Sequence, residues 1–147
     1  MAKLDTLLEV GILIGVSILI LIMAHRIISD LDIWLHLKTG EVIFKNKSVP
    51  TKDIFSFTAE GKPWVDHEWL FQVVSYLIYE KWGANGLIAL QSQILILSFL
   101  ILFLMGYREI KSFSFVALLI LITAYASSSR FNIRPDIFSM LFFSLYL

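Results

Sequence analysis

Two acidic residues directly after the first long apolar segment are the strongest candidates for chemistry in this chain. Asp30 and Asp32 follow an uncharged apolar run that extends from Val10 to Ala24. Charged side chains are costly near lipid, so an ionisable cluster at such a boundary favours a functional site. On a helix, Asp32 and His36 would lie one turn apart on the same face. A carboxylate in this position can act as a general base or help to hold a divalent cation.

A structural explanation of the same pair is equally open. Ser29 and Asp32 have the spacing of a helix capping box, in which each side chain bonds a backbone N–H at the start of the helix. Asp30 would then be a first-turn acid that the helix dipole favours. An Asp-x-Asp pair alone does not decide between a helix cap and a catalytic site.

A second cluster, Asp66-His67-Glu68, has the His-Glu pair of zinc protease helices. Those helices need another histidine three positions after the glutamate, and Phe71 stands there, so the zinc protease interpretation fails. The cluster is more typical of a helix start with Asp66 as the N-cap. His67 and Glu68, like His36, remain candidates for a supporting role beside the first acidic pair.

The third cluster is cationic and follows a later apolar run. Arg130 and Arg134, with Pro135 restricting the backbone between them and the next helix, can bind a phosphate group through paired N–H donors. The alternative is that both side chains extend to lipid headgroups without a specific ligand.

The composition places these clusters in a membrane protein. Of 147 residues 58% are apolar, 12 basic side chains balance 12 acidic ones, and there is no cysteine. The charge balance gives no reason to expect nucleic acid as a partner, and a disulfide or zinc-thiolate site is impossible.

Three apolar segments are long enough to cross a bilayer, which takes about 20 helical residues. They cover residues 7–26, 84–107 and 112–129. A fourth apolar stretch, 137–147, would cover only about half a bilayer at roughly 1.5 Å per residue. We therefore expect the chain to be the front part of a larger protein and to form one membrane module.

The polar segment 27–83 predicts two short helices. The first would open near Ser29 and run to about Lys45, and the second would run from His67 to Trp82 and end at Gly83. The aromatic side chains of the second helix suit the membrane interface. Alternating aromatic residues around Glu60-Gly61 predict a small hairpin that pairs 54–58 with 62–65.

Three parts of this polar segment, residues 32–40, 49–56 and 64–70, together resemble a group of bacterial polytopic membrane proteins. That group is related to the membrane-embedded glycosyltransferases of the GT-C class. The Asp-x-aromatic-x-His-Leu-Lys order of residues 32–38 is also similar to the first-loop signature of oligosaccharyltransferase catalytic subunits and of mannosyltransferases that use a lipid-phosphate sugar.

The resemblance implies an all-α fold of polytopic transmembrane helices with a large extracytoplasmic loop that holds two membrane-parallel helices. It assigns Asp32, with Asp30 second, as the catalytic acid-base or metal-binding carboxylate. Arg134, with Arg130 second, would bind the phosphate of a polyprenyl-phosphate-linked sugar. A divalent cation is an expected cofactor in some members of the class, whereas others work without metal. The N-terminus would be cytoplasmic and the protein a multi-pass protein of the cell membrane, although the positive charges flanking the spans do not settle this orientation.

Taken together, these features predict the N-terminal part of a membrane glycosyltransferase, inactive until the missing C-terminal part or another membrane subunit completes it. The alternative is a small non-catalytic multi-pass protein that acts as a partner subunit or scaffold. In that case four aromatic residues of the polar segment would contribute more to binding the partner protein than the aspartates do. They are Trp64, Trp69, Tyr76 and Trp82. The sequence identifies neither the sugar nor the acceptor.

Overall fold

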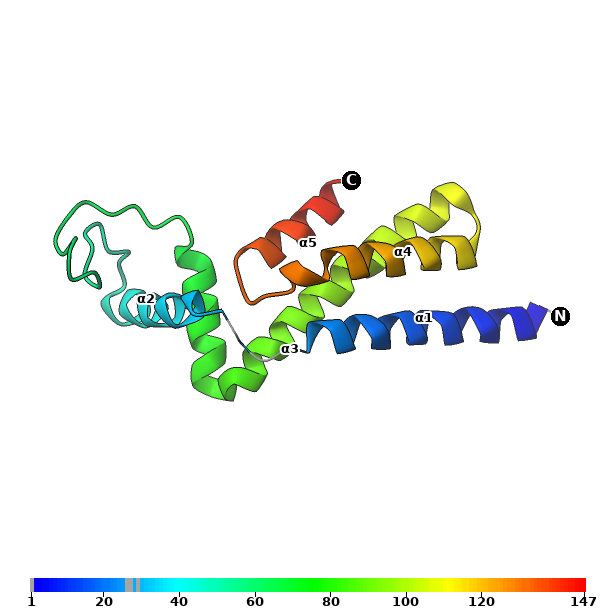
Figure 1. The fold of residues 1–147 in the computed structure, drawn as a ribbon, viewed down its shortest axis with the longest axis horizontal. Coiled ribbons are helices and arrows are strands. Elements are labelled where there is room, and N and C mark those ends of the chain that lie inside the picture. Colours follow the sequence, from blue (N-terminus) through cyan, green and yellow to red (C-terminus); the bar gives the residue numbers. More distant parts are fainter. Residues whose placement is uncertain (1, 26–27, 29) are drawn as a thin grey trace. The chain divides into compact units, whose positions relative to one another are not determined.

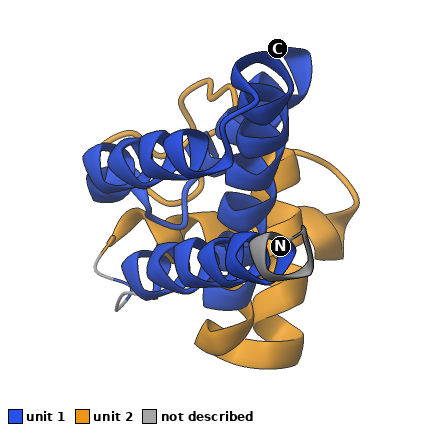
Figure 2. Ribbon diagram, turned by 90° about the vertical axis from the view of Figure 1, so that its right-hand side faces the viewer, with its two compact units in different colours: residues 1–28, 88–147 blue, residues 29–87 orange. Residues whose placement is uncertain are grey.

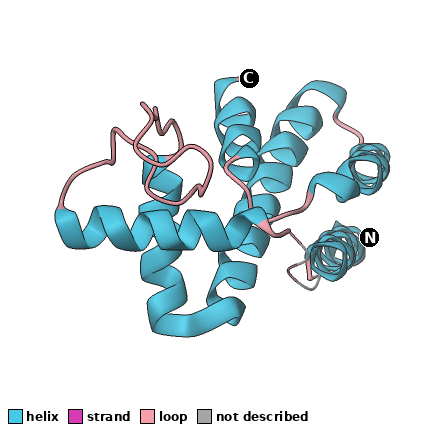
Figure 3. Ribbon diagram, turned by 60° about the vertical axis from the view of Figure 1, so that its left-hand side comes forward, coloured by secondary structure: helices cyan, strands magenta, loops and turns pink. Residues whose placement is uncertain are grey.

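A computed structural model describes residues 2–25, 28 and 30–147. The described residues form helices and contain no strand (Figures 1 and 3), which confirms the all-α prediction at this level. The elements are α1 (Ala2–Ala24), α2 (Asp32–Asn46), α3 (Trp69–Ile110), α4 (Phe113–Ser127), the 3-10 helix η1 (Ser128–Arg130) and α5 (Asp136–Tyr146).

The chain divides into two compact units (Figure 2). Unit 1 comprises residues 1–28 and 88–147, and unit 2 comprises residues 29–87. Each unit is described separately below.

Three helical segments are long and apolar enough to cross a membrane: Thr6–Ala24, Trp69–Ile110 and Phe113–Arg130. Each overlaps one of the three predicted spans, and Trp69–Ile110 also includes most of the helix predicted separately over 67–82. Many large apolar side chains on these segments are exposed, including Leu7 at 62% and Ile22 at 64%. Exposed apolar faces of this kind suit contact with lipid, and the chain is therefore a membrane-associated protein.

The core of unit 1 forms where α1 and α4 pack with the C-terminal part of α3. Ile20 of α1, Phe99 and Phe103 of α3, and Ala124 of α4 are buried in one cluster. Lipid tails are as apolar as these side chains, so close packing contributes more to helix association here than the hydrophobic effect does. Phe131, just beyond η1, belongs to the same cluster, and its ring contacts that of Phe99 at 5.9 Å between centroids.

In unit 2, α2 packs against the N-terminal part of α3. Ile33, Leu37 and Ile43 of α2 are buried. Gly40 faces the backbone of α3 so closely that a Cβ atom there would overlap the carbonyl oxygen of Gln72 and lie 2.9 Å from the Cβ of Tyr76. A residue without a side chain is therefore required where the two helices meet.

The predicted hairpin is wrong in length and register. The segment between α2 and α3 contains one isolated antiparallel bridge, between Lys52 and Pro63. Around this bridge, the N–H of Asp53 donates to the carbonyl of Lys62 at 2.9 Å, and the N–H of Trp64 donates to the carbonyl of Thr51 at 2.9 Å.

The side chain of Asp53 explains why the pairing stops there. Its Oδ1 accepts from the backbone N–H groups of Phe55 and Ser56, each at 2.9 Å. These hydrogen bonds turn the chain and use donors that a strand over 54–58 would need. The Ser56 hydroxyl, with the backbone N–H groups of Ser56 and Phe55, also lowers the pKa of the Asp53 carboxyl.

The predicted helix end at Gly83 appears as a break inside α3. Gly83 has φ 63° and ψ −156°, a conformation that essentially only glycine adopts without strain. The helices before and after it are those predicted as 67–82 and 84–107, with small shifts at their ends.

Candidate functional site

The two candidate carboxylates stand at the start of α2, in unit 2. The Oδ1 of Asp30 accepts from the backbone N–H of Asp32 at 3.1 Å, so Asp30 supplies one of the hydrogen bonds that open the helix. Ser29, which the sequence predicts as the cap, lies outside the described residues. Asp32 is the first residue of α2 and is exposed, whereas Asp30 is half-buried.

This geometry separates the roles that the two aspartates can play. One oxygen of Asp30 is engaged by the backbone, so its capping role has direct structural support. The exposed carboxylate of Asp32 lies at the helix end where the backbone dipoles favour negative charge. Asp32, the more exposed of the two, stays the predicted acid-base residue.

The candidate supporting residues His36 and Glu68 come together in unit 2. The Nδ1 of His36 lies 3.5 Å from the Oε2 of Glu68, and the His36 ring packs edge-on against Phe71 at 5.2 Å between centroids. His36 is only 9% exposed, so it contributes to the packing between α2 and α3. His67 is exposed.

Asp66 is not the N-cap predicted for a helix that begins at His67, because α3 begins two residues later, at Trp69. The Oδ1 of Asp66 accepts from the backbone N–H of Glu68 at 3.1 Å and from Nε2 of Gln72 at 3.0 Å. Gln72 is 3% exposed and Ser75 is fully buried, so the N-terminal part of α3 buries two polar side chains in unit 2. Sequence reasoning missed both residues, although polar side chains spaced three apart on an apolar helix are a known signal of helix contact.

The candidate carboxylates do not form a metal site by themselves. Among the described residues, no three His, Asp or Glu side chains come together in a way that could hold a metal ion. One or two carboxylates can hold Mg²⁺ when waters and a phosphate supply its other ligands, so the divalent cation stays a prediction.

The outer face of α2 carries an ion-pair ladder. Glu41 accepts from Lys38 at 2.8 Å and from Lys45 at 2.6 Å. The hydrogen bonds from these two ammonium groups lower the pKa of Glu41 to about 2, and Glu41 raises the pKa of Lys45 in return.

The lowered pKa of Glu41 predicts an acid-sensitive contribution to the stability of α2. A carboxylate with a lower pKa in the folded chain stabilises it above its ordinary pKa of 4.5, and this contribution is lost as the pH falls toward about 2. In the parent chain, helix content should fall as the pH is lowered from 4.5 to about 2, and in Glu41→Gln it should fall less. Circular dichroism at low salt measures helix content over this pH range. Because the ladder is exposed, high salt should shrink the difference. Identical acid titrations of the variant and the parent chain at low salt would contradict the prediction.

The candidate cations lie in unit 1, at the end of the third apolar segment. Arg130 is the last residue of η1, and both Arg130 and Arg134 are exposed. Between them, the N–H of Arg134 donates to the carbonyl of Asn132 at 2.9 Å, and Phe131 anchors the loop in the core. The loop therefore presents two guanidinium groups from a fixed backbone.

Gln91 of α3 fixes this loop. Its Nε2 donates to the carbonyl of Phe131 at 2.7 Å and lies 3.4 Å from the carbonyl of Ala24, at the end of α1. Gln91 is 3% exposed. Polar side chains inside an apolar span usually face neighbouring helices; Gln91 does so, whereas Gln93 on the same helix is exposed.

We expect Gln91→Leu to destabilise unit 1. The substitution keeps the side-chain volume close to that of glutamine but leaves two buried carbonyl groups without this donor, at a cost of about 1–2 kcal/mol. Thermal unfolding in detergent measures the effect, and Gln93→Leu is the matched control because Gln93 lies on the same helix and is exposed. An equal shift in both variants would show that the Gln91 hydrogen bonds do not matter for stability.

No family model, curated protein or solved structure matches this chain.

The candidate carboxylates Asp30 and Asp32 belong to unit 2, and the candidate cations Arg130 and Arg134 belong to unit 1.

Proposed function

We propose that this chain is the N-terminal part of an integral-membrane glycosyltransferase that transfers a sugar from a polyprenyl-phosphate donor to an extracytoplasmic acceptor. One observation carries the proposal: an exposed carboxylate opens the helix that follows the first membrane-compatible helix. That helix, α1, ends at Ala24, and α2 begins at Asp32. The loop motifs that resemble GT-C enzymes support the same assignment.

In the proposed reaction Asp32 takes the proton of an acceptor hydroxyl group. The acceptor oxygen forms a bond to the anomeric carbon of the sugar, and the bond from that carbon to the lipid phosphate oxygen breaks. The electron pair stays on the phosphate, whose charge Arg134 and Arg130 stabilise. Asp32 then releases the proton to water. General base catalysis of this kind contributes about 10²- to 10⁴-fold to a rate.

The proposal includes an orientation in the cell membrane, with a cytoplasmic N-terminus, an outward-facing segment 27–83 and its two helices parallel to the membrane. The chain contains no cysteine, so single cysteines can report the topology. Ser56 and Ser112 are both exposed. We expect a membrane-impermeant thiol reagent added to intact cells to label Ser56→Cys, and to label Ser112→Cys only after the cells are opened. Labelling of both variants from the same side would overturn this orientation.

The function is tested in cells that make the protein. Deletion of its gene should raise the level of an unconsumed polyprenyl-phosphate sugar and remove the same sugar from an extracytoplasmic acceptor, both restored by the gene in trans. Mass spectrometry of the lipid extract and sugar analysis of the envelope measure the two changes. Unchanged donor and acceptor pools would reject the proposal.

One observation favours the non-catalytic alternative, in which the chain is a partner subunit. Trp69 is 45% exposed and Trp82 is 59% exposed, and exposed tryptophans are frequent anchors of protein interfaces. A single stoichiometric partner in crosslinking experiments, combined with full function after Asp30→Ala and Asp32→Ala, would support that alternative.

A further inference from the structure

Within unit 1, a short turn joins two helices that are each long and apolar enough to cross a membrane. α3 ends at Ile110 and α4 begins at Phe113, so Lys111 and Ser112 connect them. A helix that crosses a bilayer leaves the hydrocarbon core where its own apolar segment ends. When both helices cross the bilayer, residues 107–113 must therefore lie among the lipid headgroups. We call these residues the α3–α4 turn.

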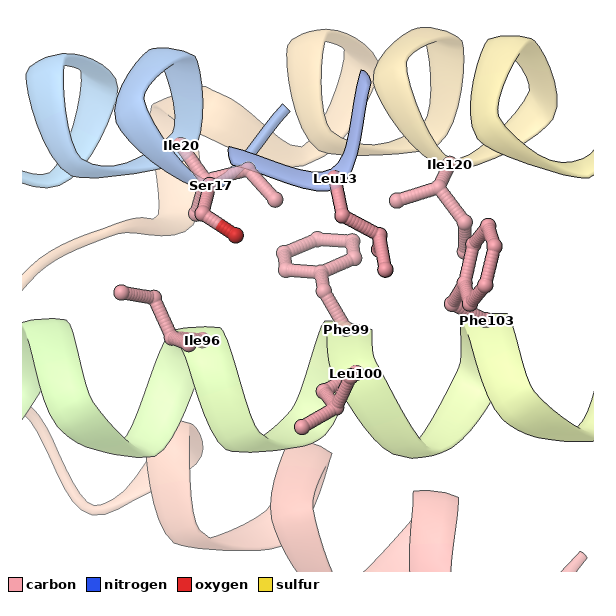
Figure 4. Close-up of a pocket in the computed structure, with 8 residues that line it drawn as sticks. All are labelled: Leu13, Ser17, Ile20, Ile96, Phe99, Leu100, Phe103 and Ile120. Atoms are coloured by element: carbon pink, nitrogen blue, oxygen red, sulfur yellow. The ribbon is translucent and has the colours of Figure 1, made fainter. Parts of the chain in front are cut away.

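Hydrogen bonds and ring contacts fix the shape of the α3–α4 turn. The N–H of Lys111 donates to the carbonyl of Tyr107 at 2.9 Å, and Lys111 has φ 56°, the left-handed conformation that often ends a helix. The ring centroid of Phe113 lies 5.0 Å from that of Phe103 and 5.9 Å from that of Tyr107. Phe103 is buried in the core of unit 1 beside Ile120 of α4 (Figure 4). The turn is thus attached to the core and presents its side chains from a fixed backbone.

The α3–α4 turn carries three charged side chains, Arg108, Glu109 and Lys111, and all three are exposed. Two cations and one acid give the turn a net charge of +1. Tyr107, beside them, is 41% exposed, and its amphipathic ring suits the level of the headgroups. In the part of the chain that the structure describes, no acidic side chain forms an ion pair with Arg108 or Lys111. Both cations are therefore available to an anion from outside the chain.

We propose that the α3–α4 turn binds the anionic headgroup of a membrane phospholipid, with Arg108 and Lys111 contacting its phosphate. A phospholipid is the occupant because headgroup phosphates surround any cation at this depth of the bilayer. The net charge of the turn favours a headgroup of net negative charge over a zwitterionic one. In the orientation proposed above, the turn faces the cytoplasm, where the membrane surface is negatively charged. The turn lies at the opposite end of α4 from Arg130 and takes no part in the proposed sugar transfer.

A single fluorescent probe beside the turn tests the proposal. Ser114→Cys, at an exposed position in the first turn of α4, can be labelled specifically because the chain has no other cysteine. The full chain is placed in phosphatidylcholine vesicles that contain an equal, small fraction of one quencher lipid. The quencher is either phosphatidylglycerol or phosphatidylcholine, each with a nitroxide on its acyl chain close to the headgroup. We expect stronger quenching by phosphatidylglycerol at low salt, and a smaller difference at high salt because salt screens the charges.

Charge variants identify the residues that bind the lipid. Arg108→Gln and Lys111→Asn each remove one cation, and asparagine tolerates the positive φ at residue 111. Each variant should lower the preference for phosphatidylglycerol about fivefold, the factor that one cation near a charged membrane surface supplies. Glu109→Gln, the matched control, removes an acid from the same turn and should raise the preference. Misfolding cannot produce these opposite changes.

Three results would each overturn the proposal. The first is equal quenching by the two lipids in the chain that carries only Ser114→Cys. The second is an unchanged preference in the double variant Arg108→Gln/Lys111→Asn, which would show that these cations only serve the end of α3, where the helix dipole favours positive charge. The third is loss of the preference when inorganic phosphate replaces chloride at equal ionic strength, which would assign the turn to a soluble anion. The probe does not report sugar transfer, so either proposal can fail without the other.

Discussion

Replacing Asp32 by asparagine is expected to lower sugar transfer by about 10²- to 10⁴-fold, the range that general base catalysis supplies. Asparagine has nearly the same shape as aspartate but cannot accept a proton from the acceptor hydroxyl. The backbone N–H of residue 32 would still donate to Asp30, so α2 should still form. Transfer of labelled sugar in native membranes gives the rate, and an N-terminal tag shows that the amount of protein in the membrane is unchanged.

Two controls make this result specific. Asp30→Asn keeps the oxygen that accepts from the Asp32 N–H and should cause a smaller loss than Asp32→Asn. Glu60→Gln removes one negative charge from an exposed position in the same unit and should have no effect. Full activity of Asp32→Asn would reject the assignment of this carboxylate and favour the partner-subunit alternative.

Replacing Gly40 by alanine is expected to disrupt unit 2. The added Cβ would overlap the backbone carbonyl oxygen of Gln72, which cannot move without shifting α3, and would lie 2.9 Å from the Cβ of Tyr76. Overpacking of this kind costs about 1–3 kcal/mol, and the rigid backbone partner places Gly40→Ala at the upper end of that range. Limited proteolysis in the segment between α2 and α3, together with thermal unfolding, measures the loss.

The matched control is Gly11→Ala, because no atom lies within 4 Å of a Cβ built at Gly11 in α1. Alanine there should leave stability unchanged or raise it by up to about 1 kcal/mol through its better helix propensity. If Gly40→Ala and Gly11→Ala resist protease and heat equally, α2 and α3 do not cross at Gly40.

The positions of the helices could be predicted from the sequence because each depends on local information. Long uncharged runs must be helical in lipid, where every backbone polar group needs a partner within its own segment. Gly83 predicted the break in α3 because few other residues adopt its conformation. Asp66 predicted the start of α3 only to within two residues: its side chain accepts from the backbone N–H of Glu68, just before the helix begins at Trp69.

The contacts between helices could not be predicted in the same way. Nothing local distinguishes Gly40, which α3 approaches closely, from Gly11, which has open space around it. The partners of Gln91, at Ala24 and Phe131, are 67 and 40 residues away in the sequence. The hairpin prediction failed for a related reason: the pattern of aromatic residues gave no sign that the Asp53 carboxylate would bind the backbone N–H groups of the first expected strand.

The chemistry itself is tested most directly by following the donor lipid. The protein is purified from its own cells through an N-terminal tag and reconstituted in liposomes with a polyprenyl-phosphate donor that carries a radiolabelled sugar. An envelope extract from the same cells supplies the acceptor. We expect the label to leave the lipid at a rate proportional to the protein, with release of polyprenyl phosphate, and to remain on the lipid with Asp32→Asn. Labelled donor that stays intact with the unmodified protein would contradict a role in sugar transfer.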